Sequence, residues 1–473
     1  MLKTKIKHYK ILSLTITYLI LFTNFYVTGS LTELKISETI DNESESYDLL
    51  IICPNRFSSS LKKLKTHKEK FGVKTNITIV ENICNDPNNK GRDKAEKIKY
   101  FIKNELEKHQ IKYVLLVGGR KNQLPSESWW VPVRYTYLNR PYAKHPEGRF
   151  LTDLYFADIY DSKGNFSSWD DDNDAIFGEW PVNESAVDIP NLKPDVSVGR
   201  LTCRNILDVK IAVNKIIKYE TGCFSNWFKK ITLIAGDTYP NKTPDFVDGE
   251  EHTNKSIQYM PDFDIVEIYG SKENLNWQNI VKEINNGCGL VFFSGHGGPN
   301  SWGTHPPFNS KEWIGDFKLL NINFLLNKNK LPVVLSASGC FNNMFNVSLT
   351  NADWVYFYGL PGGIPKCWGE KLALKPFGGS IATIASTAFS YESSDIDSKV
   401  GGCEWLDIHF FEEYNISDSK ILGKCWSNTI NRFVQNFTID WTNTSKTGDA
   451  LIVKNVEQWL LIGDPSLKIG GYN

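Results

Sequence analysis

A histidine and a cysteine each follow an apolar run in the second half of the chain. His296 follows the run 290–294 and lies between two glycines, and Cys340 follows the run 331–335. A free thiol, with a pKa near ~8.5, is mostly protonated at neutral pH, whereas only the thiolate attacks a carbonyl carbon well. An imidazole can accept that proton and later donate one to a leaving amine. The pair therefore predicts acyl transfer through a covalent acyl-enzyme.

The glycine after the histidine suggests how a developing oxyanion would be held. Without a side chain, Gly297 lets its backbone N–H approach a reacting carbonyl, so we expect the N–H groups of Gly297 and Cys340 to donate to the oxyanion. The alternative is a core histidine and a buried thiol with no shared chemistry, because short motifs of this kind also arise by chance.

The elements around these residues predict how the two side chains would meet. Apolar runs at 49–53, 113–117, 231–235, 289–294 and 332–337 alternate with amphipathic helical stretches. Continuously apolar strands separated by helices are typical of a parallel sheet covered on both faces. Ligands bind in such sheets beyond the carboxyl ends of the strands. Two neighbouring strands that end in His296 and Cys340 would place both over one crevice.

The N-terminus predicts export. Four lysines precede an apolar stretch at 11–27, and small residues follow it. This is the pattern of a secretory signal peptide, here 1–29. The alternative is an uncleaved membrane anchor, since the stretch approaches the ~17–20 residues that span a bilayer. A polar stretch, 30–46, comes next.

The remainder of the chain divides into two predicted parts. We expect a smaller N-terminal α/β subdomain at 47–224 and a catalytic subdomain at 225–473. The first part contains a long irregular region, in which 129–138 and 154–160 have the composition of strands.

Composition excludes some classes of partner. The 473 residues carry a net charge of −1, which gives no electrostatic reason to expect nucleic acid. We expect no membrane contact beyond the N-terminal signal, and the sequence makes no prediction of oligomeric state. The nine cysteines show no zinc-binding spacing, so we expect no catalytic metal.

Several blocks, in order, resemble the gingipain family of cysteine peptidases, in the caspase, legumain and gingipain clan. They are 286–297 with 301–304, 331–340, 379–387 and 463–469. The resemblance implies a caspase-like αβα sandwich with a mostly parallel sheet, and endopeptidase activity on polypeptides through His296 and Cys340. One departure is Gly339, where relatives often carry alanine.

Acidic residues upstream of the histidine suggest two further roles. Asp237 follows the run 231–235 and would face the same crevice, where it would orient His296 or else form a turn. The family resemblance places an acidic residue that binds a basic P1 side chain near Asp248 and Glu250, and with Trp302 these form the predicted substrate pocket. The alternative for these carboxylates is a helix N-terminus, which favours acidic residues without any ligand.

A second acidic cluster predicts a structural Ca²⁺ site. Asp170, Asp172 and Asp174 alternate along the chain, with Glu179 nearby, as in the first ligands of an EF-hand loop. Ala175 stands where an EF-hand has glycine. Calcium sites known in the gingipain family favour this interpretation, and a solvated acidic loop is the alternative.

The sequence therefore favours a secreted cysteine endopeptidase, and a preference for basic P1 residues is a further hypothesis. Two alternatives remain: an inactive surface binding protein with the same fold, and a transpeptidase that uses the same site.

Overall fold

The computed structural model describes residues 46–139, 148–222, 226–240, 246–350, 363–393 and 401–472. The predicted signal peptide, 1–29, and the polar stretch up to residue 45 lie outside the described residues. Within the described ranges, no helix combines the length and the apolar character needed to cross a bilayer.

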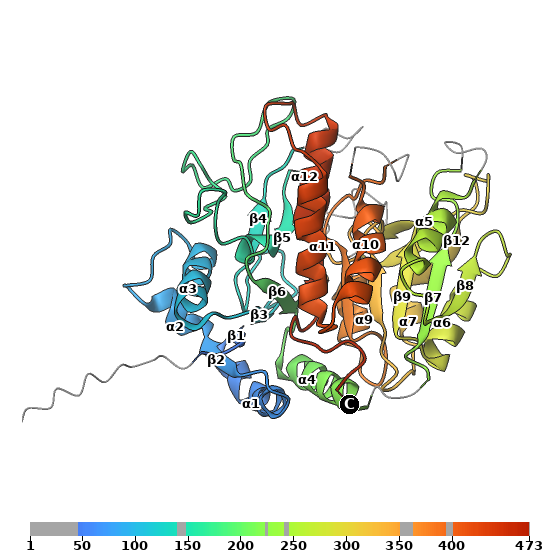
Figure 1. Cartoon of the computed structure of the whole chain (residues 1–473), viewed down its shortest axis with the longest axis horizontal. Helices are drawn as coiled ribbons and strands as arrows, with labels where there is room; N and C mark the ends of the chain where they lie inside the picture. The colour runs from blue at the N-terminus through green and yellow to red at the C-terminus, as the bar shows by residue number, and fades with distance from the viewer. Residues whose placement is uncertain are drawn as a thin grey trace, which may run out of the picture. The chain divides into compact units, whose positions relative to one another are not determined.

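One ten-stranded sheet forms the centre of the fold (Figure 1). Its spatial order is β2-β1-β3-β6-β15-β14-β13-β9-β7-β8. The strands are β1 (Leu49–Cys53), β2 (Thr75–Ile79), β3 (Tyr113–Val117), β6 (Ser197–Leu201), β7 (Lys230–Ala235), β8 (Asp264–Tyr269), β9 (Leu290–Ser294), β13 (Val333–Ser336), β14 (Ala382–Ser386) and β15 (Trp459–Ile462). Neighbours pair in parallel from β2 to β6 and from β14 to β8. The predicted, mostly parallel sheet is confirmed.

The final strand joins the two groups of parallel strands. β15 runs antiparallel to β14 and touches β6 through one residue pair, Ile462 with Arg200. The predicted subdomain boundary, after residue 224, falls between α4 and β7. Strands from both sides of that boundary therefore share one sheet.

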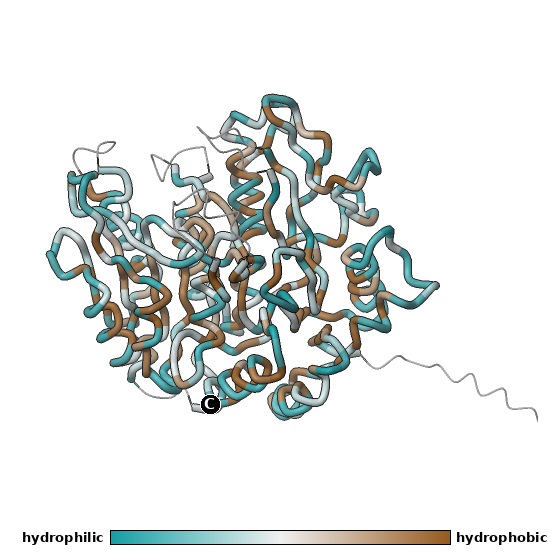
Figure 2. Tube along the Cα trace, turned by 180° about the vertical axis from the view of Figure 1, so that it is seen from behind, coloured by the Kyte–Doolittle hydropathy of each residue, from teal (hydrophilic) through white to brown (hydrophobic). Residues whose placement is uncertain are grey.

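Both faces of the sheet are buried, as continuously apolar strands require. On β9, Leu290 and Phe292 pack into one core cluster, whereas Val291 and Phe293 pack into another. Successive side chains of a strand point to opposite faces, so the two clusters lie on opposite sides of the sheet. In Figure 2 the apolar segments concentrate in the interior and the polar ones in outer loops.

The helices supply the outer layers. They are α1 (Asn55–Lys70), α2 (Val80–Asn85), α3 (Lys94–His109), α4 (Ile206–Gly222), α5 (Asp248–Ile257), α6 (Trp277–Asn286), α7 (Leu319–Ile322), α9 (Trp368–Ala373), α10 (Cys403–Ile416), α11 (Leu422–Asn436) and α12 (Gly448–Gln458). Local signals set their ends. The side chain of Asn276 accepts from Asn279 N–H at the start of α6, and Gly287, with φ 101°, ends it. Phe410 and Phe411 of α10 pack on one face of the sheet, and Ile280 of α6 packs on the other.

Two small sheets lie outside the main one. β4 (Arg134–Thr136) pairs with β5 (Phe150–Thr152), and β10 (His296–Gly298), β11 (Ser301–Thr304) and β12 (Ile314–Lys318) form an antiparallel ribbon. In the irregular region, the strand predicted at 129–138 is only three residues long. The strand predicted at 154–160 is wrong: Leu154–Phe156 forms a short 3₁₀ helix.

Candidate active site

His296 and Cys340 follow two neighbouring strands. β9 and β13 pair in parallel, and each continues into a turn at its carboxyl end. Gly295, with φ 154°, lies between β9 and the ribbon that begins at His296, and a Cβ there would come 2.9 Å from the Trp302 ring. After β13 the chain turns through residues 337–339 to Cys340. Phe341 follows with φ 60°, a backbone conformation that residues other than glycine rarely adopt.

The two turns touch through their backbones. A Cβ on Gly297 would lie 2.5 Å from the carbonyl carbon of Gly339. The Asn342 side-chain amide donates to the carbonyls of Gly298, at 2.8 Å, and Ser301, at 3.0 Å. These contacts fix the histidine turn against the cysteine turn.

The glycine before the cysteine has a local cause. A Cβ at Gly339 would collide with the side chains of Asn342 and Ser336, which are hydrogen-bonded to each other at 3.0 Å. Alanine therefore does not fit this turn.

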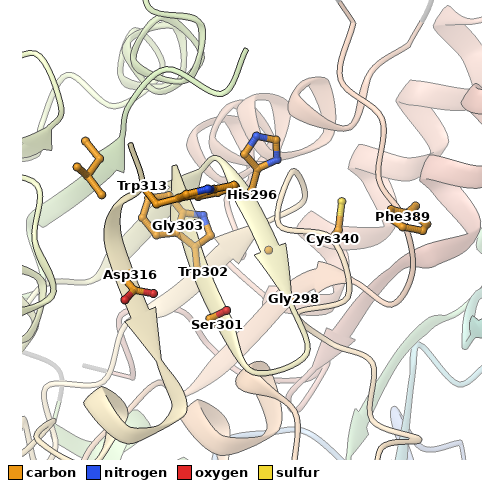
Figure 3. Close-up of a pocket in the computed structure, with 11 residues that line it drawn as sticks. His296, Gly298, Ser301, Trp302, Gly303, Trp313, Asp316, Cys340 and Phe389 are labelled. Atoms are coloured by element: carbon orange, nitrogen blue, oxygen red, sulfur yellow. The ribbon is translucent and has the colours of Figure 1, made fainter. Parts of the chain in front are cut away.

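Both candidate catalytic side chains line one cavity of ≈ 380 Å³. In Figure 3, the Cys340 sulfur and the His296 ring project from adjacent turns to the same side, and Trp313 lies beside the ring. Trp302, Asp316 and Phe389 also line the cavity. The structure thus brings together Cys340, His296, Gly297 and Trp302 of the predicted site residues.

A backbone carbonyl orients the histidine. His296 Nε2 lies 2.8 Å from the carbonyl oxygen of Thr238. Because a carbonyl can only accept, Nε2 carries the hydrogen, and in the neutral ring Nδ1 is left as the basic nitrogen. Tyr239, His305 and Trp313 contact the ring at centroid distances of 5.5, 5.7 and 5.3 Å.

Asp248 holds the segment that carries this carbonyl. Its carboxylate accepts from the N–H groups of Thr238, at 2.6 Å, and Tyr239, at 3.1 Å. Asp248 is buried at the first position of α5. It therefore acts on His296 through the 238–239 backbone.

Asp237 lies next to this segment and is fully buried. Its carboxylate accepts from Phe308 N–H at 2.8 Å, and its backbone pairs with His305. Burial, with a contribution from the charge of Asp248, raises the pKa of Asp237. The structure places Asp237 where it holds residues 305–308, while the adjacent Thr238 provides the carbonyl that accepts from His296.

The Cys340 sulfur lies against a serine. Ser390 N–H donates toward Sγ at 3.4 Å, and the Ser390 hydroxyl lies 3.3 Å from it. The same hydroxyl donates to the carbonyl of Ser338 at 3.0 Å. An N–H group directed at sulfur favours the thiolate over the thiol, because hydrogen bonding to a charged form stabilises it.

A buried carboxylate, Glu404, contacts the segment that carries Ser390. Both oxygens of Glu404, at the start of α10, accept from Ser393 N–H, at 3.1 and 3.2 Å. Burial, with a contribution from the charge of Asp248, raises the pKa of Glu404 to about 8. Among the described residues, neither Glu404 nor Asp248 forms an ion pair with lysine or arginine.

Glu250 and Asp316 differ from this pair. Glu250 accepts from the N–H, at 2.8 Å, and the hydroxyl, at 2.5 Å, of Ser271. Like Asp248 and Glu404, it does not line the cavity. Asp316 lines the cavity but is about half exposed and pairs with Lys318 at 2.5 Å.

Three of the predicted calcium ligands converge. One oxygen from each of Asp170, Asp172 and Asp174 lies within 4.8 Å of the others. Burial raises the pKa of Glu179, and the negative charges of Asp174 and Asp172 contribute. The Glu179 carboxylate therefore lies near the cluster. Oxygen donors of this kind suit Ca²⁺.

Existing contacts already neutralise part of this cluster. Arg92 pairs with Asp170 at 2.5 Å, and the N–H groups of Asp174 and Ala175 donate to the same carboxylate. Asp172 and Asp174 are exposed. The residues fit a cation held mainly by these two, with Asp170 shared with Arg92.

Sequence reasoning missed three residues of this site. Thr238 acts through its carbonyl, Ser390 through its N–H and hydroxyl, and Asn342 through an amide that joins two turns. The pattern at 379–387 marked the strand before Ser390, but nothing in the sequence set that serine apart.

The chain matches the family model of peptidase family C25 over residues 42–470. It is 22% identical over 441 residues to Gingipain R2 of Porphyromonas gingivalis, covering 90% of this chain and 46% of that protein. It is also 22% identical over 441 residues to Gingipain R1 of the same organism, covering 90% of this chain and 34% of that protein. The chain spans less than half the length of these relatives.

Two solved structures share the fold. The Arg-specific cysteine proteinase gingipain R aligns with a TM-score of 0.56 and 19% identity, over 91% of this chain and 79% of that one. The complex of Porphyromonas gingivalis RgpB pro- and mature domains aligns with a TM-score of 0.56 and 20% identity, over 89% and 79%. At these identities the likeness establishes the fold alone, and the predicted caspase-like αβα architecture is confirmed. The chain belongs to peptidase family C25, the gingipain family of cysteine peptidases.

Proposed function

We propose that this protein is a secreted cysteine endopeptidase in which Cys340 is the nucleophile and His296 its acid–base partner. The observation that carries the proposal is the backbone contact of Gly297 with Gly339 and Cys340, which holds both side chains over one cavity. Membership of a peptidase family makes polypeptides the substrate class. The N-terminal pattern supports export.

The reaction begins with proton transfer from Cys340 to Nδ1 of His296. The thiolate attacks the carbonyl carbon of the scissile peptide, and the carbonyl π electrons move to oxygen. The N–H groups of Gly297 and Cys340 donate to this oxyanion. As the tetrahedral intermediate collapses, the C–N bond breaks and imidazolium protonates the leaving amine.

Hydrolysis of the acyl-enzyme follows the same steps with water. Neutral His296 takes a proton from water, hydroxide adds to the thioester carbonyl, and the C–S bond breaks to release the acid. Thr238 keeps the proton on Nε2 throughout, so Nδ1 serves as base in acylation and in deacylation.

Preference for a basic P1 residue is the second part of the proposal. Glu404 is a buried carboxylate that accepts from Ser393, in the 390–393 segment that contacts the nucleophile. Asp248 is a second buried carboxylate, whose charge contributes to the raised pKa of Glu404. A buried carboxylate without a counter-ion is costly, and an arginine or lysine side chain of the substrate would supply one. Gingipain R, whose fold this chain shares, is an Arg-specific cysteine proteinase, in agreement with this proposal.

A structural Ca²⁺ at Asp170, Asp172, Asp174 and Glu179 completes the proposal. The ion would neutralise carboxylates that alternate along one loop and would order that loop. It lies in the N-terminal part of the fold and has no role in the chemical steps.

Fluorogenic peptides with Arg, Lys, Leu or Asn at P1 test the activity and the specificity. We expect hydrolysis of the Arg and Lys peptides, loss of it in Cys340→Ala and His296→Ala, and rapid iodoacetamide labelling of Cys340 that His296→Ala slows. An inert Cys340 with no turnover would favour the inactive binding protein. Products joined to an added amine, instead of free acids, would favour the transpeptidase.

Variants locate the specificity pocket. Asp248→Asn and Glu404→Gln should each lower the ratio of kcat/KM for Arg over Leu peptides by roughly tenfold or more. Asp316→Asn is the matched control. It also removes a carboxylate that lines the cavity, but this carboxylate is already paired with Lys318. If only Asp316→Asn changed the ratio, the basic side chain would bind in that cavity instead.

A further inference from the structure

A second cavity, of ≈ 510 Å³, lies at the opposite end of β13 from the active site. Leu331, just before β13, lines this cavity, whereas Cys340 follows the other end of the strand. α4, at the lower edge of the view in Figure 1, forms one wall. Ile211, Asn214, Lys215 and Lys218 of α4 recur at the spacing of one helix face. The loops before β13 and β14 form the other walls.

The lining of this cavity is positively charged. Lys215, Lys218 and Lys328 line it, and the lining contains no carboxylate. Within the part of the chain that the structure describes, Lys218 and Lys328 form no ion pair. Their charges therefore face the cavity without a counter-ion from the described parts of the chain.

Lys215 brings a buried cation to this wall. Its ammonium donates to the carbonyls of Ala373, at 2.7 Å, and Gly378, at 3.0 Å, with longer contacts to two more carbonyls. Carbonyl oxygens satisfy its hydrogens but provide no countercharge for its ammonium form. Burial, with a contribution from the charge of Lys375, lowers the pKa of Lys215 well below its usual value. An anion in the adjoining cavity would supply the missing countercharge.

The same cavity has apolar walls. Ile211, Leu331 and Phe377 contribute hydrocarbon surface, and Phe377 is 80% exposed. Its backbone carbonyl accepts from Lys328 N–H at 3.2 Å, and both residues adopt left-handed backbone angles, with φ 62° and 51°. Such angles are unfavourable for these residue types and persist only where the surrounding structure holds them. The two loops are thus held together, with the ring of Phe377 and the ammonium of Lys328 at one rim of the cavity.

We propose that this cavity binds a small organic anion, with a phosphate or carboxylate head group on a planar apolar body. The head group would lie between Lys218 and Lys328, near Lys215, and the apolar body against Phe377 and Leu331. The volume falls in the range of small-molecule sites, which combine apolar walls with a few placed polar groups. The site is separate from the peptidase chemistry and stands whether or not the proposed function holds.

Calorimetric titration of the full chain at low ionic strength tests the proposal. The probes are 1-naphthyl phosphate, 1-naphthoate and the neutral 1-naphthalenemethanol. We expect both anions to bind at least about tenfold more tightly than the alcohol, with affinity that falls as salt rises. Tighter binding of the phosphate would identify phosphate esters as the ligand class, and tighter binding of the naphthoate would identify carboxylates. Equal binding of the alcohol, or no binding of either anion, would overturn the proposal.

Matched variants place the ligand. Lys218→Ala and Lys328→Asn should each weaken binding of the better anion by roughly tenfold, since asparagine tolerates the left-handed backbone at 328. Lys210→Ala is the control, because Lys210 is an exposed residue of the same helix that does not line the cavity.

Acetylation of the wild-type protein provides a readout that does not depend on variants. The bound anion should protect Lys218 and Lys328 from acetic anhydride and leave Lys210 reactive. Equal protection of all three lysines, or of none, would contradict binding in this cavity.

Discussion

The backbone of Gly297 packs directly against that of Cys340. A Cβ on Gly297 would lie 2.7 Å from the Cys340 carbonyl oxygen, closer than real Cβ contacts allow. The histidine turn and the nucleophile turn can therefore be this close only with glycine at 297. This contact joins the positions of the acid–base group, the nucleophile and both proposed oxyanion donors.

Gly297→Ala should therefore separate the two turns and lower kcat/KM by about 100-fold or more, since a 1 Å displacement of reacting groups has such effects. Gly303→Ala is the matched control. Gly303 lines the same cavity, and a Cβ at that position would have its nearest neighbour at 3.4 Å, an ordinary contact distance. We expect near wild-type kinetics and melting temperature for the control, and for Gly297→Ala a folded protein whose melting temperature is a few degrees lower. Full activity in Gly297→Ala would show that the turns can adjust without cost.

The hydroxyl of Ser390 should tune the nucleophile. Ser390→Ala removes a group 3.3 Å from Sγ and keeps the N–H at 3.4 Å. The hydroxyl hydrogen, which is donated to the Ser338 carbonyl, can turn to Sγ once the thiol ionises. Because the variant lacks this hydrogen, we expect kcat to fall roughly 3–10-fold and the midpoint of iodoacetamide labelling against pH to rise.

Ser390→Thr retains the hydroxyl and should restore most of the lost activity. An unchanged labelling midpoint in Ser390→Ala, with lower activity, would mean that the serine only supports the loop.

Glu404 should make stability depend on pH. Its pKa of about 8 in the folded protein lies above that of an unfolded glutamate, ~4.3. The folded state therefore binds more protons between these values, and its stability falls as pH rises from about 4.3 to 8. Glu404→Gln removes this ionisation, so its melting temperature should exceed that of the wild type at pH 8 and approach it at pH 4.5.

Glu251→Gln, at an exposed position on α5, is the control and should show the wild-type dependence on pH. Parallel melting curves for Glu404→Gln and wild type would refute the raised pKa.

The sequence predicted the chemistry better than the contacts that position it. His296 and Cys340 could be found because each follows a largely apolar strand, and parallel neighbours bring the ends of such strands together. Thr238 could not be found, since every residue has a carbonyl and only the folded turn decides which one meets the ring. Asp237 was identified one position away from that carbonyl, because strand periodicity locates the end of β7 but not the atom that turns toward the crevice.

The strands of the sheet show the same limit on what the sequence could predict. The run that became β1 is apolar at every position, and those that became β9 and β13 are apolar up to a final serine, whereas β15 is a short run directly after a helix. In sequence, such a run reads as the continuation of α12. The strand prediction at 154–160 was wrong for a related reason. Aromatic residues are common in strands, but Tyr155 and Phe156 pack in a 3₁₀ helix instead.

Calcium should stabilise the protein through the exposed carboxylates of the acidic loop. Asp170 already pairs with Arg92, so Asp172 and Asp174 hold the charge that remains for a cation. After chelation, added Ca²⁺ should raise the melting temperature by a few degrees, because a ligand that binds only the folded state stabilises it. Asp172→Asn should lose most of this rise, whereas Asp262→Asn, an exposed aspartate on another segment, should retain it. Mg²⁺ at the same concentration should have a smaller effect, since it needs a tighter octahedral set of oxygens than this loop provides. A melting temperature indifferent to Ca²⁺ would mean that Arg92 and the backbone N–H groups suffice to hold the loop.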